Sequence, residues 1–373
     1  MKKLGFGMMR LPLLNADDPK SVDIAEVCRM VDVFMERGFT YFDTAYMYHQ
    51  FYSEEVVREA LVKRYPRESF QLADKLPSMF LKKEGDQERI FAEQLEKCGV
   101  SYFDYYLVHS LNAAHYETVT RLGSFEFVAE LKRQGKVRKM GFSFHDSAEM
   151  LDRILCDHPE VDFVQIQLNY LDWDSANVQS RLCYETCLRH GKPVIVMEPV
   201  KGGTLAKVPS RAEGMLRRAE PNNSVASWAI RFAASCPEVF MVLSGMSNME
   251  QLCDNLGYMT DFVPLTDAER EMLAETVRII HADIAVACTS CRYCVDGCPK
   301  NIEIPKYFAL YNQAMHAESK EFSTEEFYYE NLTKTYGKAS DCIRCKKCEQ
   351  VCPQHIRITA ALKKVAELFE GND

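Results

Sequence analysis

Eight cysteines near the end of the 373-residue chain form two groups that share one spacing. Each group follows the pattern C-x2-C-x2-C-x3-C and is followed directly by a proline. In chain order the eight are Cys288, Cys291, Cys294, Cys298, Cys342, Cys345, Cys348 and Cys352. Three thiolates on one tight loop can hold three irons of a cube, while the fourth cysteine of the group binds the neighbouring cube. The spacing therefore predicts two 4Fe-4S clusters.

This crossed ligation assigns Cys352 to the cluster of the first three cysteines, and Cys298 to the cluster of the second group. A pair of structural zinc sites is the alternative, but zinc typically uses cysteine pairs separated by a longer loop. Four cysteines within eleven residues, found twice, favour iron and sulfur. The motif resembles bacterial ferredoxins, and its 43-residue insert resembles the helical ferredoxins of respiratory and flavin-linked reductases.

Four polar side chains at or just after the ends of predicted strands could carry a second chemistry. Asp43 ends one strand, Tyr48 follows it by five residues, and Lys75 and His109 end the next two strands. Reduction of a carbonyl group requires a proton donor at the oxygen while hydride arrives at the carbon. A tyrosine can serve if a neighbouring ammonium lowers its pKa. Lys75 would supply that charge, Asp43 would hold Lys75, and His109 would orient the carbonyl.

The elements that must position these residues alternate from the start of the chain to about residue 260. Eight apolar, β-branched runs are separated by amphipathic helical stretches. The predicted strands are Leu4–Met9, Thr40–Asp43, Phe70–Lys75, Phe103–Val108, Val137–Ser143, Phe163–Gln167, Val194–Met197 and Phe240–Ser244. No G-x-G-x-x-G turn follows the first strand, which disfavours an open dinucleotide-binding sheet. We expect an α/β fold, a closed (β/α)8 TIM barrel with its chemistry at the C-terminal ends of the strands.

The chain is long enough for such a barrel and a smaller second unit. We predict a barrel domain over residues 1–265, a bridging helix over 266–285, and a mostly helical, ferredoxin-like two-cluster domain over 286–373. Residues 110–124, which include His115 and Tyr116, are expected either to line the substrate pocket or to pack at the surface.

Asp43, Tyr48, Lys75 and His109 occur in the order of the catalytic tetrad of the aldo/keto reductases, which this sequence resembles over about residues 1–260. The resemblance is strongest in the segments Phe42–Tyr48, Tyr105–His109, Lys139–Ser143 and Gln165–Asn169. It implies an oxidoreductase that reduces an aldehyde or ketone, or oxidises the alcohol, with NAD(P)H. The clusters would be coupled to that reaction or would modulate it.

The same resemblance implies six cofactor contacts, at Ser143, Gln165, Met197, Ser244, Gly245 and Asn255. Met197 replaces the aromatic residue that usually stacks on the nicotinamide, and Phe144 replaces the asparagine that usually follows Ser143. Gly245 and Gln251 stand where basic residues usually bind a 2′-phosphate. NADPH, NADH and a flavin therefore all remain open.

A second function stays open as well, that of an electron-transfer protein. In it, a flavin or a redox protein partner at the barrel mouth exchanges electrons with the clusters. Hydride carries two electrons whereas each cluster carries one, so a flavin would normally stand between them.

Composition limits the partners and the cellular compartment that we expect for the protein. The formal net charge of −9 disfavours nucleic acid as a partner, and no window is apolar enough for a membrane span. Seven further cysteines are scattered and are expected to be buried, which indicates a reducing compartment, the cytoplasm. Oxygen-sensitive clusters suggest an anaerobic host.

Overall fold

The computed structural model of the chain describes residues 2–175, 178–315 and 324–371. Eight parallel strands close into a barrel in chain order, which confirms the predicted (β/α)8 fold and excludes the open sheet. The strands are β1 (Leu4–Gly7), β2 (Tyr41–Asp43), β3 (Gln71–Pro77), β4 (Phe103–Leu111), β5 (Val137–Phe144), β6 (Phe163–Gln167), β7 (Val194–Met197) and β8 (Val239–Gly245).

Most of the helices that cover the barrel are amphipathic, as the sequence pattern predicts. They are α1 (Ile24–Glu36), α2 (Ser53–Val57), α3 (Asp86–Cys98), α4 (Ala113–Arg121), α5 (Ser124–Arg133), α6 (Ala148–Asp157), α7 (Ser180–Arg189), α8 (Ser210–Ala219), α9 (Val225–Ala234), α10 (Met249–Met259) and α11 (Asp267–Asp283). In α1 the buried residues Val27, Met30, Val31 and Phe34 recur at helical spacing. The Asp23 carboxylate accepts a hydrogen bond from the Glu26 N–H and so caps the start of that helix.

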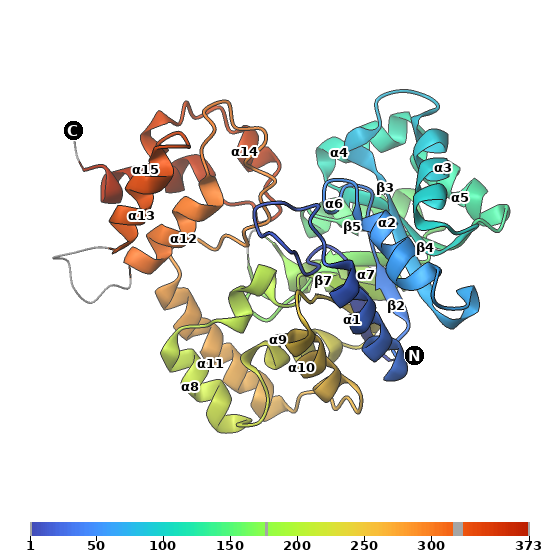
Figure 1. Ribbon diagram of the computed structural model, residues 1–373, viewed down its shortest axis with the longest axis horizontal. Helices are drawn as coiled ribbons and strands as arrows, with labels where there is room; N and C mark the ends of the chain where they lie inside the picture. Colours follow the sequence, from blue (N-terminus) through green and yellow to red (C-terminus); the bar gives the residue numbers. More distant parts are fainter. Residues whose placement is uncertain (1, 176–177, 316–323, 372–373) are drawn as a thin grey trace.

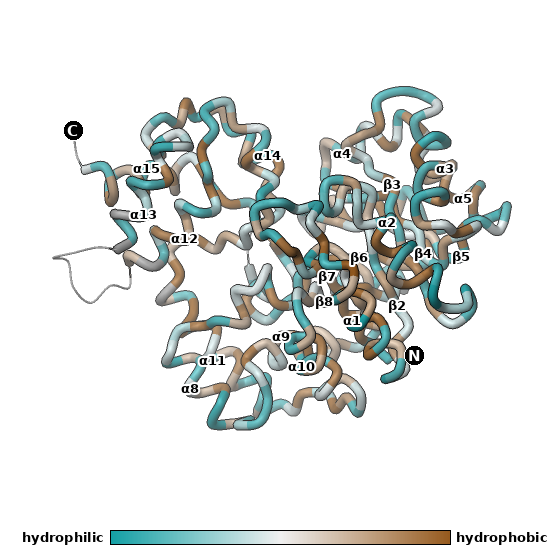
Figure 2. The backbone as a smooth tube through the Cα atoms, viewed as in Figure 1, coloured by the Kyte–Doolittle hydropathy of each residue, from teal (hydrophilic) through white to brown (hydrophobic). Residues whose placement is uncertain are grey.

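Apolar side chains fill the inside of the barrel, so the barrel is a packed core rather than a pore. This inner layer comprises Tyr41, Ala73, Leu107, Phe163, Ile195, Met241 and Leu243. Gly141 allows β5 to approach β6 closely, because a Cβ atom there would lie 2.5 Å from the Phe163 carbonyl oxygen. Figure 2 shows hydrophobic segments in the central strands and hydrophilic segments along the outer loops.

A second, helical body follows the barrel (Figure 1). It contains α12 (Ile304–Ala314), α13 (Thr324–Thr333), α14 (Lys347–Gln350) and α15 (Ile358–Phe369). It has an apolar core of its own, which includes Tyr307, Phe308, Tyr329, Leu362 and Val365. Helix α11 packs against α8 and leads into this body, so it lies where the bridge is predicted. The exact domain boundaries stay predictions, and residues 1, 176–177, 316–323 and 372–373 lie outside the described residues.

No helix in the described ranges has both the length and the apolar character that a membrane span requires. The scattered cysteines follow the prediction only in part. Cys98, Cys183, Cys187 and Cys236 are buried, and Cys28 is half-buried, but Cys156 and Cys253 are exposed. The expectation of seven buried thiols is therefore wrong for the last two, which lie on the outer faces of α6 and α10.

Candidate active site and cysteine clusters

A cavity of about 350 Å³ lies at the C-terminal end of the barrel strands. Gly7, Asp43, His109, Gln165 and Met197, which stand at or near the ends of five different strands, all line it. This is the end of a (β/α)8 barrel at which chemistry takes place, because loops and strand ends converge there. The volume lies in the range of small-molecule and cofactor sites.

The structure brings the four residues of the predicted tetrad together at this cavity. The Lys75 ammonium is fully buried and donates hydrogen bonds of 2.6 Å to Asp43 Oδ1 and of 2.6 Å to the Thr44 carbonyl oxygen. Lys75 Nζ lies 5.0 Å from the centre of the Tyr48 ring. The rings of Tyr48 and His109 are nearly perpendicular, with their centres 6.2 Å apart. Lys75 itself stands behind the cavity wall, which Asp43, Tyr48 and His109 form.

The electrostatics of the site differ from the prediction in one respect. We expected Lys75 to lower the pKa of Tyr48, but burial, followed by the negative charge of Asp43, raises that pKa well above its ordinary value. Burial also raises the pKa of Asp43, against the opposing effect of the Lys75 ammonium. The pKa of His109 is lowered well below its ordinary value by burial and then by Lys75. The site therefore holds a protonated phenol and a neutral imidazole at neutral pH.

Five of the six predicted cofactor contacts line the cavity, namely Gln165, Met197, Ser244, Gly245 and Asn255. Gln165 Nε2 lies 3.5 Å from Met197 Sδ, while its Oε1 atom is buried without a hydrogen-bond partner among the described residues. Asn255 Nδ2 donates to Ser244 Oγ at 2.8 Å and so positions that hydroxyl.

The sixth predicted contact, Ser143, is buried beside the cavity but does not line it. Its Oγ atom accepts a hydrogen bond of 2.7 Å from the Ser110 N–H. Ser110 adopts a left-handed backbone with φ of 59°, immediately after His109. The observed role of Ser143 is to hold this turn, and its contact with a cofactor stays a prediction.

Sequence reasoning missed several residues that line the cavity, among them Arg10, Glu198 and Tyr293. Arg10 follows β1 by three residues, and its Nη2 atom is buried without a partner within the described ranges. Glu198 follows β7 with a φ of 55°, and burial raises the pKa of its carboxyl. Tyr293 comes from the second domain. The position of Arg10 and Glu198 just after strand ends was the available signal, whereas no local pattern points to Tyr293.

Residues 110–124 were expected either to line the substrate pocket or to pack at the surface, and the structure favours packing. Most of them form α4, and Tyr116 of that helix is buried. Its hydroxyl donates to Asp157 Oδ2 at 2.7 Å, and its ring packs edge-on against His158. Neither His115 nor Tyr116 lines the cavity, so this segment packs on the outside of the barrel.

The eight clustered cysteines surround two small cavities in the second domain. Cys288, Cys291, Cys294 and Cys352 line one of them, and Cys298, Cys342, Cys345 and Cys348 line the other. Each set combines three cysteines of one group with the last cysteine of the other, as crossed ligation requires. No histidine or carboxylate lines either cavity among the described residues, and Ile304 borders both. Sulfur-only donors in apolar surroundings suit 4Fe-4S clusters.

The first of these cavities faces the barrel. The Lys201 ammonium, buried after β7, pairs with Asp172 at 2.6 Å and donates to Gln354 Oε1 at 2.6 Å, two residues beyond Cys352. Gln167 Nε2 donates to the same Gln354 oxygen at 3.1 Å. These buried contacts hold the segment around Cys352 against the ends of β6 and β7.

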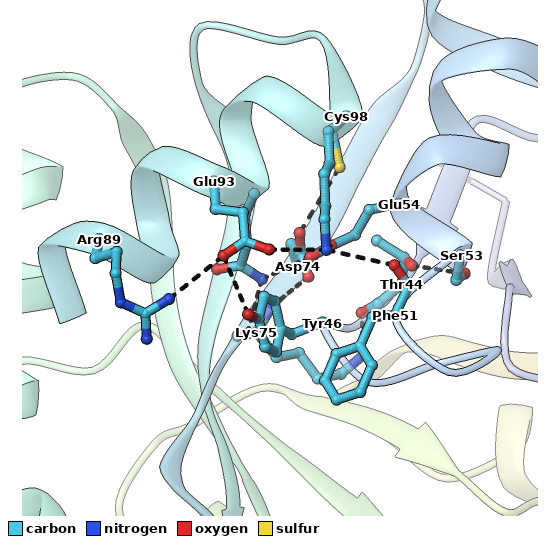
Figure 3. Close-up of polar contacts among 12 residues, drawn as sticks. Thr44, Tyr46, Phe51, Ser53, Glu54, Asp74, Lys75, Arg89, Glu93 and Cys98 are labelled. Carbon is cyan, nitrogen blue, oxygen red and sulfur yellow. Dashed lines mark hydrogen bonds and ion pairs between the residues drawn. The ribbon is translucent and has the colours of Figure 1, made fainter. Parts of the chain in front are cut away.

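Two buried carboxyl groups, Glu54 and Asp74, lie close together outside the cavity lining (Figure 3). Asp74 precedes Lys75 and therefore points outward, where it meets Glu54 of α2. Burial raises the pKa of both carboxyl groups, and the charge of Glu54 raises that of Asp74 further. Gln94 Nε2 donates at 3.0 Å to both Glu54 Oε1 and the Lys75 carbonyl oxygen. The pair therefore shares a proton, because two carboxylates in contact cannot both ionise cheaply.

We expect Asp74→Asn to stabilise the barrel at pH 8 relative to the unchanged protein. The raised pKa of Asp74 means that the folded state keeps a proton which the unfolded chain loses near pH 4. The stabilisation is thus complete below pH 4 and is lost as pH rises towards the folded pKa, at about 1.4 kcal/mol per pH unit for one proton. Asparagine removes this loss while still filling the site.

Denaturant titrations between pH 5 and pH 9, followed by tryptophan fluorescence, measure this effect, since both tryptophans, Trp173 and Trp228, lie in the barrel. Asp17→Asn, on an exposed loop, is the control and should leave the pH dependence unchanged. If the unfolding free energy of Asp74→Asn depends on pH as steeply as that of the unchanged protein, Asp74 and Glu54 do not share a proton.

Two family models match the chain. The model of the aldo/keto reductase family matches residues 3–278, and that of a 4Fe-4S dicluster domain matches residues 287–356. Among curated proteins, acetyl-CoA decarbonylase/synthase complex subunit alpha 1 of Methanosarcina acetivorans is 29% identical over 126 residues. That match covers 34% of this chain and 13% of the relative, so the chain spans only a small part of that protein.

Solved structures share the barrel. An aldo/keto reductase from Klebsiella pneumoniae in complex with NADP and acetate is 20% identical, with a TM-score of 0.59 over 74% of this chain and 91% of that one. The holo form of aldo-keto reductase AKR11C1 from Bacillus halodurans is 24% identical, with a TM-score of 0.58 over the same shares, 74% and 91%. Together with the family model, which covers most of the chain, this establishes that the protein belongs to the aldo/keto reductase family and is an oxidoreductase with a C-terminal 4Fe-4S dicluster domain.

Proposed function

We propose that the protein interconverts an aldehyde or ketone and the corresponding alcohol, with a nicotinamide dinucleotide as the hydride carrier. The observation that supports this most is the meeting of Tyr48, His109 and the Lys75–Asp43 ion pair at one cavity. A bound reduced nicotinamide would supply the hydride. The solved relative from Klebsiella pneumoniae carries NADP, and its similarity lies in the barrel fold.

The cavity offers partners that fit such a dinucleotide. The unpartnered Gln165 Oε1 atom, near Met197, can accept a hydrogen bond from a carboxamide at the reacting end. The unpartnered guanidinium nitrogen of Arg10 can donate to a phosphate oxygen. Ser244 and Gly245, at the end of β8, bring a hydroxyl group and backbone close to the same space. We propose these residues as the cofactor site.

In this proposal Tyr48 donates its proton to the carbonyl oxygen of the substrate. Its raised pKa keeps the phenol protonated until the reaction demands the proton. The Lys75 ammonium, oriented by Asp43, then stabilises the phenolate that remains. His109, held neutral by its lowered pKa, donates a hydrogen bond that orients the carbonyl group. Oxidation of the alcohol uses the same groups in reverse.

We further propose that the eight cysteines hold two 4Fe-4S clusters. The first cluster would be held by Cys288, Cys291, Cys294 and Cys352, and the second by Cys298, Cys342, Cys345 and Cys348. Each cluster supplies one-electron transfer when bound. Because Cys345 is exposed, oxygen would reach the second cluster, which favours an anaerobic and reducing setting such as the cytoplasm of an anaerobe.

The proposed activity is tested with protein purified and assayed without oxygen. NADH or NADPH is mixed with a panel of aldehydes and ketones, and the loss of nicotinamide absorbance is followed. Carbonyl-dependent oxidation supports the proposal. Absence of both turnover and dinucleotide binding would overturn it.

One observation favours the alternative of an electron-transfer protein. Cys291, a proposed cluster ligand, lines the same cavity as Tyr48, so a flavin there would lie next to a one-electron carrier. Denaturing the anaerobic protein and recording the absorbance of the supernatant tests for it. Released flavin at about one equivalent per chain would favour the alternative, and its absence would leave the nicotinamide proposal.

We expect Arg10→Ala to weaken dinucleotide binding by about tenfold or more, with a smaller change in kcat. Among the described residues Arg10 is the one arginine or lysine that lines the cavity, so its loss removes the main charge partner for phosphate. Fluorescence titration with NADH and NADPH measures the effect. Arg211→Ala, on an exposed face of α8, serves as the control. Equal affinities for the Arg10→Ala and control proteins would exclude this role.

A further inference from the structure

The loop of the first cysteine group reaches into the candidate active site. Tyr293 lies between Cys291 and Cys294, and it lines the cavity together with Tyr48 and His109. Cys291, two residues before it, lines the same cavity. An aromatic ring carried between two proposed cluster ligands therefore forms part of the wall that faces the reacting groups.

This loop packs closely against the barrel. Gly202, in the turn after β7, has a φ of 63°, and a Cβ atom there would lie 2.4 Å from the Thr289 carbonyl oxygen. The buried contact of Lys201 with Gln354 holds the segment of the fourth ligand in the same way. Pro353, next to Cys352, also lines the cavity. Both segments that surround the first cluster cavity thus touch the space in which a substrate would bind.

The two cysteine groups differ in their contact with the active-site cavity. Lys347 occupies the position in the second group that Tyr293 occupies in the first. Its side chain is exposed and borders only the second cluster cavity. None of the second cluster's four proposed ligands, Cys298, Cys342, Cys345 and Cys348, lines the active-site cavity. A change in the active site can therefore act directly on the first cluster alone.

We propose that Tyr293 is a substrate-specificity residue, and that the loop which carries it links two properties energetically. These properties are the occupancy of the active site and the redox state of the first cluster. This inference rests on the proposed function and extends it by naming the wall and the cluster involved. Linkage is reciprocal: if a ligand shifts the potential of the first cluster, reduction of that cluster must change the affinity for the ligand by the same free energy.

The linkage is measured by redox titration of the anaerobic holoprotein, followed by electron paramagnetic resonance. The cavity is filled with tetrahydro-NAD and benzoate, which occupy the nucleotide and carbonyl sites without transferring hydride. We expect the potential of one cluster to shift and that of the other to stay constant. A tenfold difference in affinity between the two redox states corresponds to about 59 mV for a one-electron centre. Equal potentials with and without the ligands would overturn the linkage.

Variants test the role of Tyr293 itself. Tyr293→Ala should raise KM for benzaldehyde about tenfold and reduce the ligand-induced shift, because the aromatic wall is lost. Tyr293→Phe should keep the KM and the ligand-induced shift of the unchanged protein, since the ring and not the hydroxyl forms the wall. Lys347→Ala, at the matched position of the second group, should leave both unchanged. Iron content is determined for each variant. If Tyr293→Ala loses iron, Tyr293→Leu replaces it in the same comparison.

The outcomes separate this inference from the proposed function. Failure of the unchanged protein to bind dinucleotide or to turn over any carbonyl compound would remove the proposed function. Turnover in which Tyr293→Ala, or Tyr293→Leu in its place, matches the unchanged protein in KM across aldehydes of different size would overturn the specificity role while leaving the proposed function intact.

Discussion

Tyr48→Phe is expected to lower kcat for carbonyl reduction by about 10³-fold while dinucleotide affinity changes little. Phenylalanine keeps the ring that stands against Lys75 and His109 but removes the one phenol among the tetrad. General acid catalysis contributes about 10²–10⁴-fold, and no other tetrad member is suited to protonate the substrate. His109 is held neutral by burial, and the Lys75 ammonium is already engaged by Asp43 and Thr44.

Tyr46→Phe is the matched control, because Tyr46 lies two residues away and is also partly buried. Its hydroxyl donates to Glu93 Oε2 at 3.1 Å (Figure 3), and neither residue lines the cavity. We expect its kcat to stay within about twofold of the unchanged protein. The assignment of Tyr48 as the acid fails if Tyr48→Phe keeps a tenth or more of the activity, or if Tyr46→Phe loses as much as Tyr48→Phe.

The pH dependence adds an independent check on the same acid. Since burial raises the pKa of Tyr48 above its ordinary value near 10, the phenol stays protonated through neutral and moderately alkaline pH. The rate of carbonyl reduction should therefore show no loss attributable to this group below about pH 10. Pre-steady-state reduction rates between pH 6 and pH 10 measure this. A fall centred near pH 7 would mean that the phenol is acidified as first expected from Lys75.

The opposite signs of the expected and the observed pKa shift of Tyr48 show what the sequence could not predict at this site. The order of Asp43, Lys75 and His109 along the strands could be read from the chain, because side chains alternate along a strand and strand ends share one rim of the barrel. The sign of the pKa shift could not, because it depends on how completely Tyr48 is removed from water. An adjacent ammonium lowers the pKa of a phenol in general, but here burial is the largest effect and raises the pKa of Tyr48 well above its ordinary value.

Most contacts between distant segments of the chain could not be predicted from the sequence, for a similar reason. Crossed ligation could be predicted because the spacing of each cysteine group leaves its fourth thiol facing elsewhere. Tyr293 follows no periodic pattern, and its place at the cavity that Tyr48 also lines depends on how the second domain docks. That docking relies on buried pairs such as Lys201 with Asp172 and Gln354, which lie far apart in the chain. Helix α4 was not predicted, and for its segment the sequence left pocket lining and surface packing as equal alternatives.

The crossed ligation itself makes the second large prediction. Cys352→Ala should remove the first cluster and leave the second, so that iron falls from about eight to about four atoms per chain. Cys352 lies at the cavity of Cys288, Cys291 and Cys294, although it is 64 positions after the first of them and only four after Cys348. Anaerobic reconstitution, iron determination and electron paramagnetic resonance provide the measurement. Cys253→Ala, an exposed thiol outside both groups, should keep all the iron.

Double variants decide between crossed ligation and ligation within each group. If Cys352 and Cys288 hold the same cluster, the double variant Cys288→Ala/Cys352→Ala loses no more iron than either single variant, because the second change acts on a cluster already absent. Cys345→Ala/Cys352→Ala should then lose both clusters. Ligation within each group predicts the reverse result for the two pairs. Cys291, a proposed ligand of the first cluster, lines the active-site cavity, whereas none of the proposed ligands of the second cluster does so among the described residues. The pair of changes that spares the second cluster therefore also tests whether carbonyl reduction needs the first.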